Sequence, residues 1–265
     1  VEGNHKNIAK NKNISAALVL QNYMLERFLE RVSLSRYHDN YIIKGGFLIA
    51  SMVGLDSRAT MDMDATIKGY PVNEEAIRKM VEDIIAVHVE DAIHFCLKSV
   101  REIREGDEYT GYRVALTADY EKMAVPLKLD ITTGDKITPR EIEYSYKLMM
   151  EDRSIRVLAY NLSTILAEKL ETVVSRGDIY ILSKLQAKNI DVDSLKAALS
   201  ATTAKRGSSE LMMRYAEIMR TVKSSDVMKR QWDNYRKDFD YAAGIEFEET
   251  CDAVVAMMDE LVSRQ

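Results

Sequence analysis

Two short segments of the sequence combine residue types that suit phosphate and metal chemistry. The first is Lys44-Gly45-Gly46, and the second is Thr60-Met61-Asp62-Met63-Asp64. Alternate residues of a strand point to the same side, so Asp62 and Asp64 would present two carboxylates with Cβ atoms about 6.5–7 Å apart. Such a pair repels itself unless a cation lies between the carboxylates, and Mg²⁺ is bound by carboxylates together with substrate phosphates.

The glycine pair adds a candidate phosphate site. Gly45 and Gly46 lie between a predicted strand at 41–43 and a predicted helix at 47–53. Glycine lets backbone N–H groups approach a phosphate, and the N-terminus of the following helix attracts it. Together these parts indicate phosphoryl or nucleotidyl transfer with two metal ions about 4 Å apart. Each part alone has a plainer explanation, because D-x-D pairs occur on solvated strand ends and Gly-Gly occurs in turns.

A third acidic residue, Asp130, lies in the alternating segment Leu127-Lys128-Leu129-Asp130-Ile131. Its side chain faces the opposite way from Leu129 and Ile131. It is therefore either a third metal ligand or an exposed strand residue, and the residues alone leave both interpretations open.

The remaining pattern predicts an α/β half followed by a helical half. Hydrophobic spacing in the first forty residues predicts a helix, and 74–89 predicts another, with Asn73 as its cap. Strands are predicted at 61–67, 95–103, 112–120, 125–131, 142–150 and 154–158, and helices at 163–175, 191–200, 208–222, 224–238 and 248–263. We therefore expect an α/β domain with its N-terminal helix at 1–160 and a helical domain at 161–265.

The chemistry-bearing residues also resemble a known family. Lys44-Gly45-Gly46 followed by Arg58, Thr60, Asp62 and Asp64 is similar to the nucleotidyltransferase toxins of the AbiEii/AbiGii type. The similarity continues through 128–131, 166–170 and Ser175-Arg176-Gly177. It implies an α+β fold, with a polymerase-β-like nucleotidyltransferase domain that has a mixed sheet, followed by an all-helical C-terminal domain.

The resemblance also implies roles for individual residues. Asp62, Asp64 and Asp130 match the catalytic metal carboxylates, which would hold Mg²⁺, as two ions. Lys169, in the apolar stretch 165–170, matches a catalytic lysine near the triphosphate of the NTP substrate. The implied nucleotide-binding residues are Lys44, Gly45, Gly46, Arg58, Thr60 and Asp178. Arg58 has an alternative interpretation, since it could pair with an acid.

One segment departs from the family. After Ser175-Arg176-Gly177 the family continues through a short loop to a helix start resembling Arg-Asp-x-x-Asp, whereas here Gly177-Asp178 runs directly into Ile179-Tyr180. Asp178 corresponds to an acid on one side or the other of that loop.

The resemblance implies a bacterial toxin of type IV toxin–antitoxin and phage abortive-infection systems. Its implied partners are an NTP, an RNA acceptor such as tRNA, and an AbiEi-type antitoxin, a winged-helix repressor. Two alternatives stay open. The protein is a nucleotide-binding interaction module, or it modifies hydroxyl groups of proteins.

Composition excludes several other classes. The 265 residues carry a net charge of −5, so a uniformly basic nucleic-acid coat is excluded, although a local basic patch is not. The sequence shows no Walker A motif, no G-x-S-x-G, no membrane-length apolar run and no signal-peptide pattern, and its two cysteines match no metal spacing. We therefore expect a cytoplasmic protein without a membrane segment.

A basic and aromatic cluster in the helical half is either an RNA-binding face or a solvated helix face; it contains Lys223, Lys229, Arg230, Trp232, Tyr235, Arg236 and Lys237.

Overall fold

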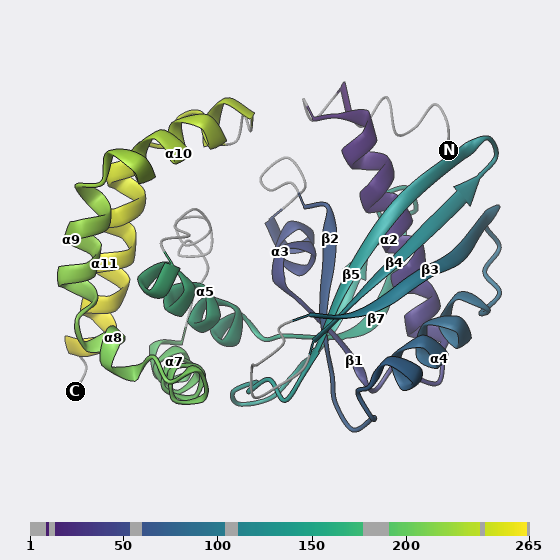
Figure 1. Cartoon of the computed structure of the whole chain (residues 1–265), viewed down its shortest axis with the longest axis horizontal. Helices are drawn as coiled ribbons and strands as arrows, with labels where there is room; N and C mark the ends of the chain where they lie inside the picture. The colour runs from purple at the N-terminus through teal and green to yellow at the C-terminus, as the bar shows by residue number, and fades with distance from the viewer. Residues whose placement is uncertain are drawn as a thin grey trace. The chain divides into compact units, whose positions relative to one another are not determined.

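The computed structural model describes residues 9–10, 14–53, 60–103, 111–176, 191–238 and 242–263. The chain divides into two compact units, one of residues 1–135 with 142–159 and one of residues 136–141 with 160–265. The first unit is built on a mixed sheet, and the described elements of the second are all helices, which confirms the predicted α+β class (Figure 1). Residues 136–141 lie within the predicted first domain of 1–160, but in the structure they belong to the helical unit. Asn161 Nδ2 donates to the carbonyl oxygens of Thr138 and Arg140 at 2.9 and 2.8 Å, which explains this grouping.

Seven strands of the described residues form one sheet in the order β3-β4-β5-β2-β1-β7-β6. The pairs β2–β5 and β1–β7 are parallel and the other neighbours are antiparallel. The strands are β1 (Tyr41–Lys44), β2 (Asp62–Ile67), β3 (Ile93–Ile103), β4 (Gly111–Tyr120), β5 (Met123–Thr133), β6 (Ile142–Lys147) and β7 (Ser154–Ala159). Every predicted strand is present, and the two predicted hairpins are the antiparallel pairs β3–β4 and β6–β7.

One face of the sheet is apolar and packs against helices. Helices α2 (Ala16–Leu34) and α4 (Glu74–Ile85) contact each other, and they contact β5 and β3 respectively (Figure 1). The side chains of Met63, Val114 and Leu129 on this face are completely buried. Because side chains alternate along a strand, the residues between them point to the opposite face, which we call the open face because Asp62, Asp64, Arg113 and Asp130 are accessible on it, although it is buried at Ile42 and Thr66.

Two helices of this unit show how local sequence sets their bounds. The side chain of Asn73 accepts a hydrogen bond of 2.8 Å from Ala76 N, which confirms the predicted cap of α4. The predicted extension of this helix to 89 is wrong, because α4 ends at Ile85, before a Val-His-Val segment whose β-branched residues disfavour a helix. Helix α3 (Gly45–Val53) follows β1 directly, and the ring of Phe47 stacks on Tyr146 of β6 at 5.6 Å.

Buried charges join α2 to the turn between β6 and β7. Arg27, whose side chain is 2% exposed, contacts Glu26 at 2.9 Å, Glu30 at 2.8 Å and Glu151 at 2.6 Å. The other oxygen of Glu26 accepts a hydrogen bond of 2.7 Å from Met149 N. Breaking one member of such a network leaves a buried charge without compensation, so these contacts hold the hairpin turn firmly on α2.

This network predicts a pH-dependent stability. Burial is the main cause that raises the pKa of Glu26 to about 7 from its ordinary value near 4.5, and Arg27 opposes it. The folded state then binds this proton more tightly than the unfolded state. The resulting stabilisation is full below pH 4.5 and is lost as the pH rises through about 7. We expect the free energy of unfolding, measured by urea denaturation, to fall over this interval, and Glu26→Gln to remove most of the slope. An unchanged slope in Glu26→Gln would contradict the assignment.

The helical unit contains α5 (Leu162–Arg176), α7 (Val192–Arg206), α8 (Ser209–Met213), α9 (Tyr215–Lys223), α10 (Asp226–Asp238) and α11 (Phe247–Ser263). Asp191 caps α7 through Ser194 N at 3.1 Å, and Gly207 ends it in the left-handed conformation. The single helix predicted at 208–222 is wrong, because the chain bends at Arg214. Helix α8 contacts α5 and α7, while α9 contacts α11 most extensively and α5 as well.

Several side chains of the basic and aromatic cluster of α9 and α10 form ion pairs or hydrogen bonds with residues of the helical unit itself. Lys229 pairs with Glu248 at 2.7 Å and Arg236 with Glu246 at 2.8 Å, and Lys223 pairs with Asp252. Trp232 is buried and donates its indole N–H to Ile245 O at 3.0 Å. These contacts favour the interpretation as a charged helix face rather than an RNA-binding face.

Candidate active site

Asp62 and Asp64 lie on β2 with their side chains half-exposed on the open face, on either side of the buried Met63. Helix α2 fixes the backbone that leads into this strand. Asn22 Nδ2 donates to Thr60 O and Gln21 Nε2 donates to Met61 O, both at 2.9 Å. Two side chains of α2 therefore anchor the backbone immediately before the strand that carries the two carboxylates.

The glycine turn lies directly against Asp64. Gly45 begins α3 with φ of 64°, and the pairing of Lys44 with Asp64 across β1 and β2 brings the Asp64 carboxylate onto it. A Cβ atom at Gly45 would lie 2.0 Å from Asp64 Oδ2. The position therefore requires glycine for its backbone conformation and for space. The carboxylate also lies at the N-terminus of α3, where the helix dipole favours negative charge.

Asp130 is the register partner of Asp64. Parallel pairing of β2 with β5 aligns Asp64 with Asp130 and Asp62 with Lys128. Paired residues of neighbouring strands share a face, so all three predicted acids lie on the open face. Of the two interpretations that the sequence left for Asp130, this placement favours the one in which it belongs to the site.

The three carboxylates are on one face but are not gathered around one point. Asp130 accepts two hydrogen bonds from the Arg113 guanidinium, at 2.8 and 2.7 Å, and Asp62 pairs with the Lys128 ammonium at 2.8 Å. Accordingly, no three His, Cys, Asp or Glu side chains of the described residues form a group that could hold a metal ion. Coordination by the predicted triad therefore stays a prediction.

The donor chemistry nevertheless fits a divalent metal. All three side chains offer hard carboxylate oxygens, which Mg²⁺ prefers. Two of the three carboxylates are already paired with cations, as expected where three acids lie close together on one face. The negative field extends beyond direct partners, because hydrogen bonding to Asp130 first, and then the charges of Asp130, Asp62 and Asp64, raise the pKa of Arg113.

Two other predicted nucleotide contacts have protein partners. Lys44 is largely buried, and its Nζ donates to Thr132 Oγ1 at 2.8 Å and pairs with Asp135. Thr60 Oγ1 donates to Asp62 O at 3.1 Å, so its hydroxyl shapes the start of β2. Gly46 is buried in the first turn of α3. The nucleotide contacts of these three residues stay predictions, and Arg58 and Asp178 lie outside the described residues.

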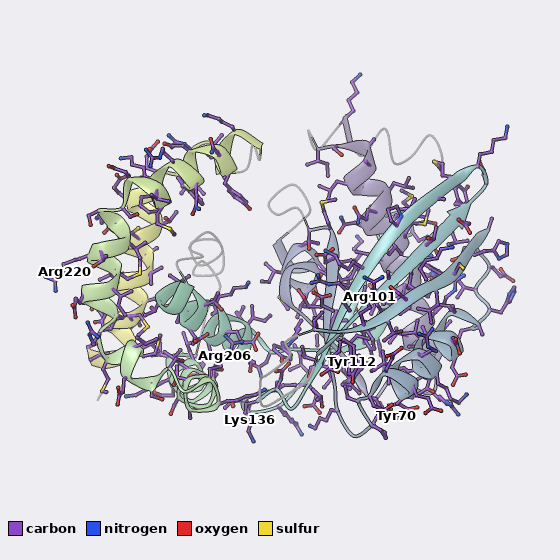
Figure 2. The ribbon with its side chains drawn as sticks, viewed as in Figure 1. Tyr70, Arg101, Tyr112, Lys136, Arg206 and Arg220 are labelled. Carbon is purple, nitrogen blue, oxygen red and sulfur yellow. The ribbon has the colours of Figure 1, made fainter. Side chains whose placement is uncertain are left out.

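Lys169 belongs to the helical unit and is half-buried on α5. Arg206 of α7 pairs with Glu168 at 3.2 Å and also with Glu171, and Figure 2 labels this arginine. These pairs hold the turn of α5 that carries Lys169. The predicted role of Lys169 at the triphosphate stays a prediction.

Sequence reasoning missed Arg113 and Lys128. Both occupy polar positions in strands whose alternate residues are buried, and Lys128 precedes Asp130 by two residues. That alternation places them on the polar face of their own strands. Their pairing with the acids depends on the registers of β4 with β5 and of β5 with β2, which no local pattern reveals.

The described fold and site define a class of protein. A mixed sheet that presents a D-x-D strand, a glycine turn against it and a third acid on the adjacent strand is the arrangement of a nucleotidyltransferase. The chain belongs to the family of nucleotidyl transferase AbiEii toxins of type IV toxin–antitoxin systems, whose model matches residues 27–255. The family resemblance is thereby confirmed: the protein is a member of a family of nucleotidyltransferase toxins, which belong to toxin–antitoxin systems.

Solved structures from one bacterial species are similar in outline. A candidate nucleotidyltransferase from H. pylori matches with a TM-score of 0.49 and 13% identity, over 95% of this chain and 99% of that chain. JHP933 from Helicobacter pylori matches with a TM-score of 0.43 and 15% identity, over 94% of both chains. No curated protein matches the sequence. None of the helices in the described part of the chain has the length and apolar character to cross a membrane.

Proposed function

We propose that the protein transfers a nucleotide from an NTP to a hydroxyl of an RNA acceptor such as tRNA, in a Mg²⁺-dependent reaction that releases pyrophosphate. The observation that carries this proposal is the alignment of Asp64 with Asp130 on adjacent strands, with Asp62 on the same face and Gly45 against Asp64. Hard oxygen donors beside a glycine turn at a helix N-terminus suit a metal-bound triphosphate.

We assign a role in metal or nucleotide binding to each residue of the site. Asp62, Asp64 and Asp130 would hold Mg²⁺, as two ions, which supplies Lewis-acid stabilisation of the charge on the phosphates. The backbone N–H groups of Gly45 and Gly46 would bind triphosphate oxygens, and Lys169 would neutralise charge on the transferred phosphoryl group. Lys44, Arg58, Thr60 and Asp178 complete the proposed nucleotide site.

Asp130 would also move a proton. Once Arg113 releases it, its carboxylate is able to accept the proton of the acceptor hydroxyl, so that the oxygen attacks the α-phosphorus of the NTP. The bond from the α-phosphorus to the bridging oxygen then breaks, and pyrophosphate leaves with the electron pair.

The direct test incubates the protein with Mg²⁺ and each of the four α-labelled NTPs, with total RNA and lysate protein present. We expect label in RNA, with one NTP preferred. Label in protein alone would contradict the RNA acceptor and support modification of protein hydroxyls. NTP binding without transfer to either would contradict catalysis and support an interaction module.

We further propose that this reaction takes place in the cytoplasm, that it arrests growth during phage infection, and that an AbiEi-type antitoxin opposes it. Expression of the chain alone should stop growth, and coexpression of a winged-helix antitoxin encoded beside it should restore growth. Unrestored growth with a folded, expressed antitoxin would contradict this partner.

Lys169 provides a prediction that separates nucleotide use from metal binding. A lysine contributes a point charge to a triphosphate. We expect Lys169→Ala to raise the KM for NTP about tenfold, since a charge-assisted contact is lost, and Lys169→Glu to raise it further through repulsion. Steady-state kinetics across NTP concentrations measures both. Lys237→Ala, at an exposed lysine of α10, is the matched control, and wild-type KM in both Lys169 variants would make Lys169 an ordinary helix residue.

A further inference from the structure

A row of charged residues crosses five strands of the open face. The registers align Arg101 of β3 with Arg113 of β4, Arg113 with Asp130 of β5, Asp130 with Asp64 of β2, and Asp64 with Lys44 of β1. Two arginines therefore lie beside the candidate catalytic acids on the side of β3. Neighbouring strands are about 4.8 Å apart, so the Arg101 backbone lies about 10 Å from that of Asp130.

The open face around these arginines is cationic and polar. Arg101 and Lys98 are exposed, and the Lys98 ammonium lies 3.3 Å from the sulfur of Cys96, on the same face. A bulge between Leu97 and Ser99 leaves Lys98 outside the β3–β4 pairing, which frees its side chain to turn this way. Between the cations lie the small residues Ser99, Ala115 and Thr117, all half-exposed. Figure 2 labels Arg101 among the strands β3–β5.

The arginine pair is unfavourable without an anion. Like charges directly opposite each other on antiparallel strands destabilise a sheet. Asp130 compensates Arg113, whereas the described residues provide no ion-pair partner for Arg101. The planar fork of arginine matches the oxygens of a phosphate, so a phosphate here would relieve the repulsion and bind with defined geometry.

We propose that this part of the open face, formed by Lys98, Ser99, Arg101, Arg113 and Thr117, binds the phosphodiester backbone of the RNA acceptor and directs its reactive hydroxyl toward Asp130. This inference rests on the proposed nucleotidyl transfer to RNA. Arg101 and Lys98 hold phosphates one or more nucleotides away from the reacting end. Arg113, between them and Asp130, exchanges its carboxylate partner for a phosphate as the acceptor enters.

The composition of the face favours an RNA backbone over a protein acceptor. Arginine is enriched at protein-binding surfaces as well, but their centres are otherwise apolar, rich in aromatic and methionine side chains and poor in lysine. The open face of β3 and β4 from Cys96 to Arg101 and from Arg113 to Thr117 presents cations, hydroxyls, one thiol and alanine, with no aromatic side chain. Because this part of the face has no aromatic ring, it cannot stack on RNA bases. We therefore expect it to bind phosphates and 2′-hydroxyls, as proteins that bind RNA stems do.

The test measures binding without catalysis. A fluorescently labelled RNA hairpin with a single-stranded 3′ end is titrated with the full chain in Mg²⁺, without NTP, and anisotropy is followed at several salt concentrations. We expect Arg101→Glu and Lys98→Glu each to weaken binding about tenfold or more. Arg101→Ala should reduce the slope of log affinity against log salt by about 1, and Arg101→Lys should restore most of it.

Arg78→Glu is the matched control. Arg78 is an exposed arginine of α4, on the other side of the sheet, and its described ion pair is only with Glu74 one turn away. The affinity of the Arg78→Glu variant for the hairpin should lie within about twofold of the wild-type affinity. In transfer assays, Arg101→Glu should raise the KM for RNA, while the affinity for Mg²⁺ and NTP, measured by calorimetry, stays within about twofold.

The outcomes separate this inference from the proposed function. Wild-type hairpin affinity in both Arg101→Glu and Lys98→Glu would overturn the RNA face, even if wild-type protein labels RNA. Loss of hairpin binding in these variants, in a protein that transfers no nucleotide, would support the face and contradict the proposed reaction. A raised KM for a protein acceptor in Arg101→Glu, with hairpin binding unchanged, would assign the face to protein and overturn the inference.

Discussion

Asp64→Asn is expected to abolish nucleotidyl transfer while the protein stays folded. Asp64 is the central acid of the open face, aligned with Asp130 on one side and lying against Gly45 on the other. The amide keeps the shape that packs on Gly45 but removes the charge that would hold metal. Loss of several kcal/mol of electrostatic stabilisation corresponds to a rate decrease of about a thousandfold or more.

The measurements for this variant separate chemistry from folding. Transfer of labelled nucleotide and growth arrest report activity, and the rise in melting temperature on adding Mg²⁺ with NTP reports binding to the folded state. We expect both the transfer and the metal-dependent rise to be lost. Asp119→Asn, at an exposed carboxylate of β4, is the matched control and should behave as wild type. Full transfer by a folded Asp64→Asn protein would remove the metal-site argument.

The parts of this site that local sequence predicts are those that depend on one strand. Alternation around Met63 and Leu129 places Asp62, Asp64 and Asp130 on polar strand faces without any knowledge of the fold. Likewise, Asn73 is a cap that the sequence identifies and the structure confirms, because a cap is made by residues three positions apart.

The parts that sequence did not predict depend on pairing between distant strands. The ion pair of Arg113 with Asp130 requires the register of β4 on β5, and the ion pair of Lys128 with Asp62 requires the register of β5 on β2. A shift of either register by one residue would move these side chains to the other face. The family resemblance identified the acids, but the identity of their cationic partners came only from the assembled sheet.

The helical unit shows a related limit. Hydrophobic periodicity across 208–222 predicts one helix, since it records which residues are buried but not against which neighbour. Helices α8 and α9 both contact α5, but α8 also contacts α7 whereas α9 also contacts α10 and α11, and the helix is broken at Arg214 between them. In the same way, Trp232 looks available for stacking in the sequence, whereas its indole N–H is bonded to Ile245 O.

Gly45→Ala is expected to abolish most nucleotidyl transfer, because it changes the residue against which the Asp64 carboxylate packs. An alanine Cβ would lie 2.0 Å from Asp64 Oδ2, 2.7 Å from Cγ and 2.9 Å from Cβ, so that the carboxylate must leave its position. The backbone strain of a non-glycine residue at a φ of 64° adds a cost of about 1–2 kcal/mol. We expect transfer to fall about a hundredfold or more, because small displacements of catalytic groups have effects of that size.

Gly207→Ala is the matched control for the strain. Gly207 has the same φ of 64° at the end of α7, and an added Cβ would meet nothing within 4 Å. Both variants should therefore lose about 1–2 kcal/mol of unfolding free energy from strain in urea denaturation, and Gly45→Ala should lose more because of the clash. Only Gly45→Ala should lose transfer.

A second substitution separates the clash from the strain within the same turn. In the double variant Gly45→Ala/Asp64→Gly the obstructing side chain is absent, so its unfolding free energy should lie below that of Asp64→Gly alone only by the cost of strain, whereas activity should not recover because the central acid is missing. Two contacting residues that interact in this way show non-additive stability effects. Additive losses in the double variant, or wild-type transfer in Gly45→Ala, would mean that the Asp64 carboxylate does not depend on the glycine turn for its position.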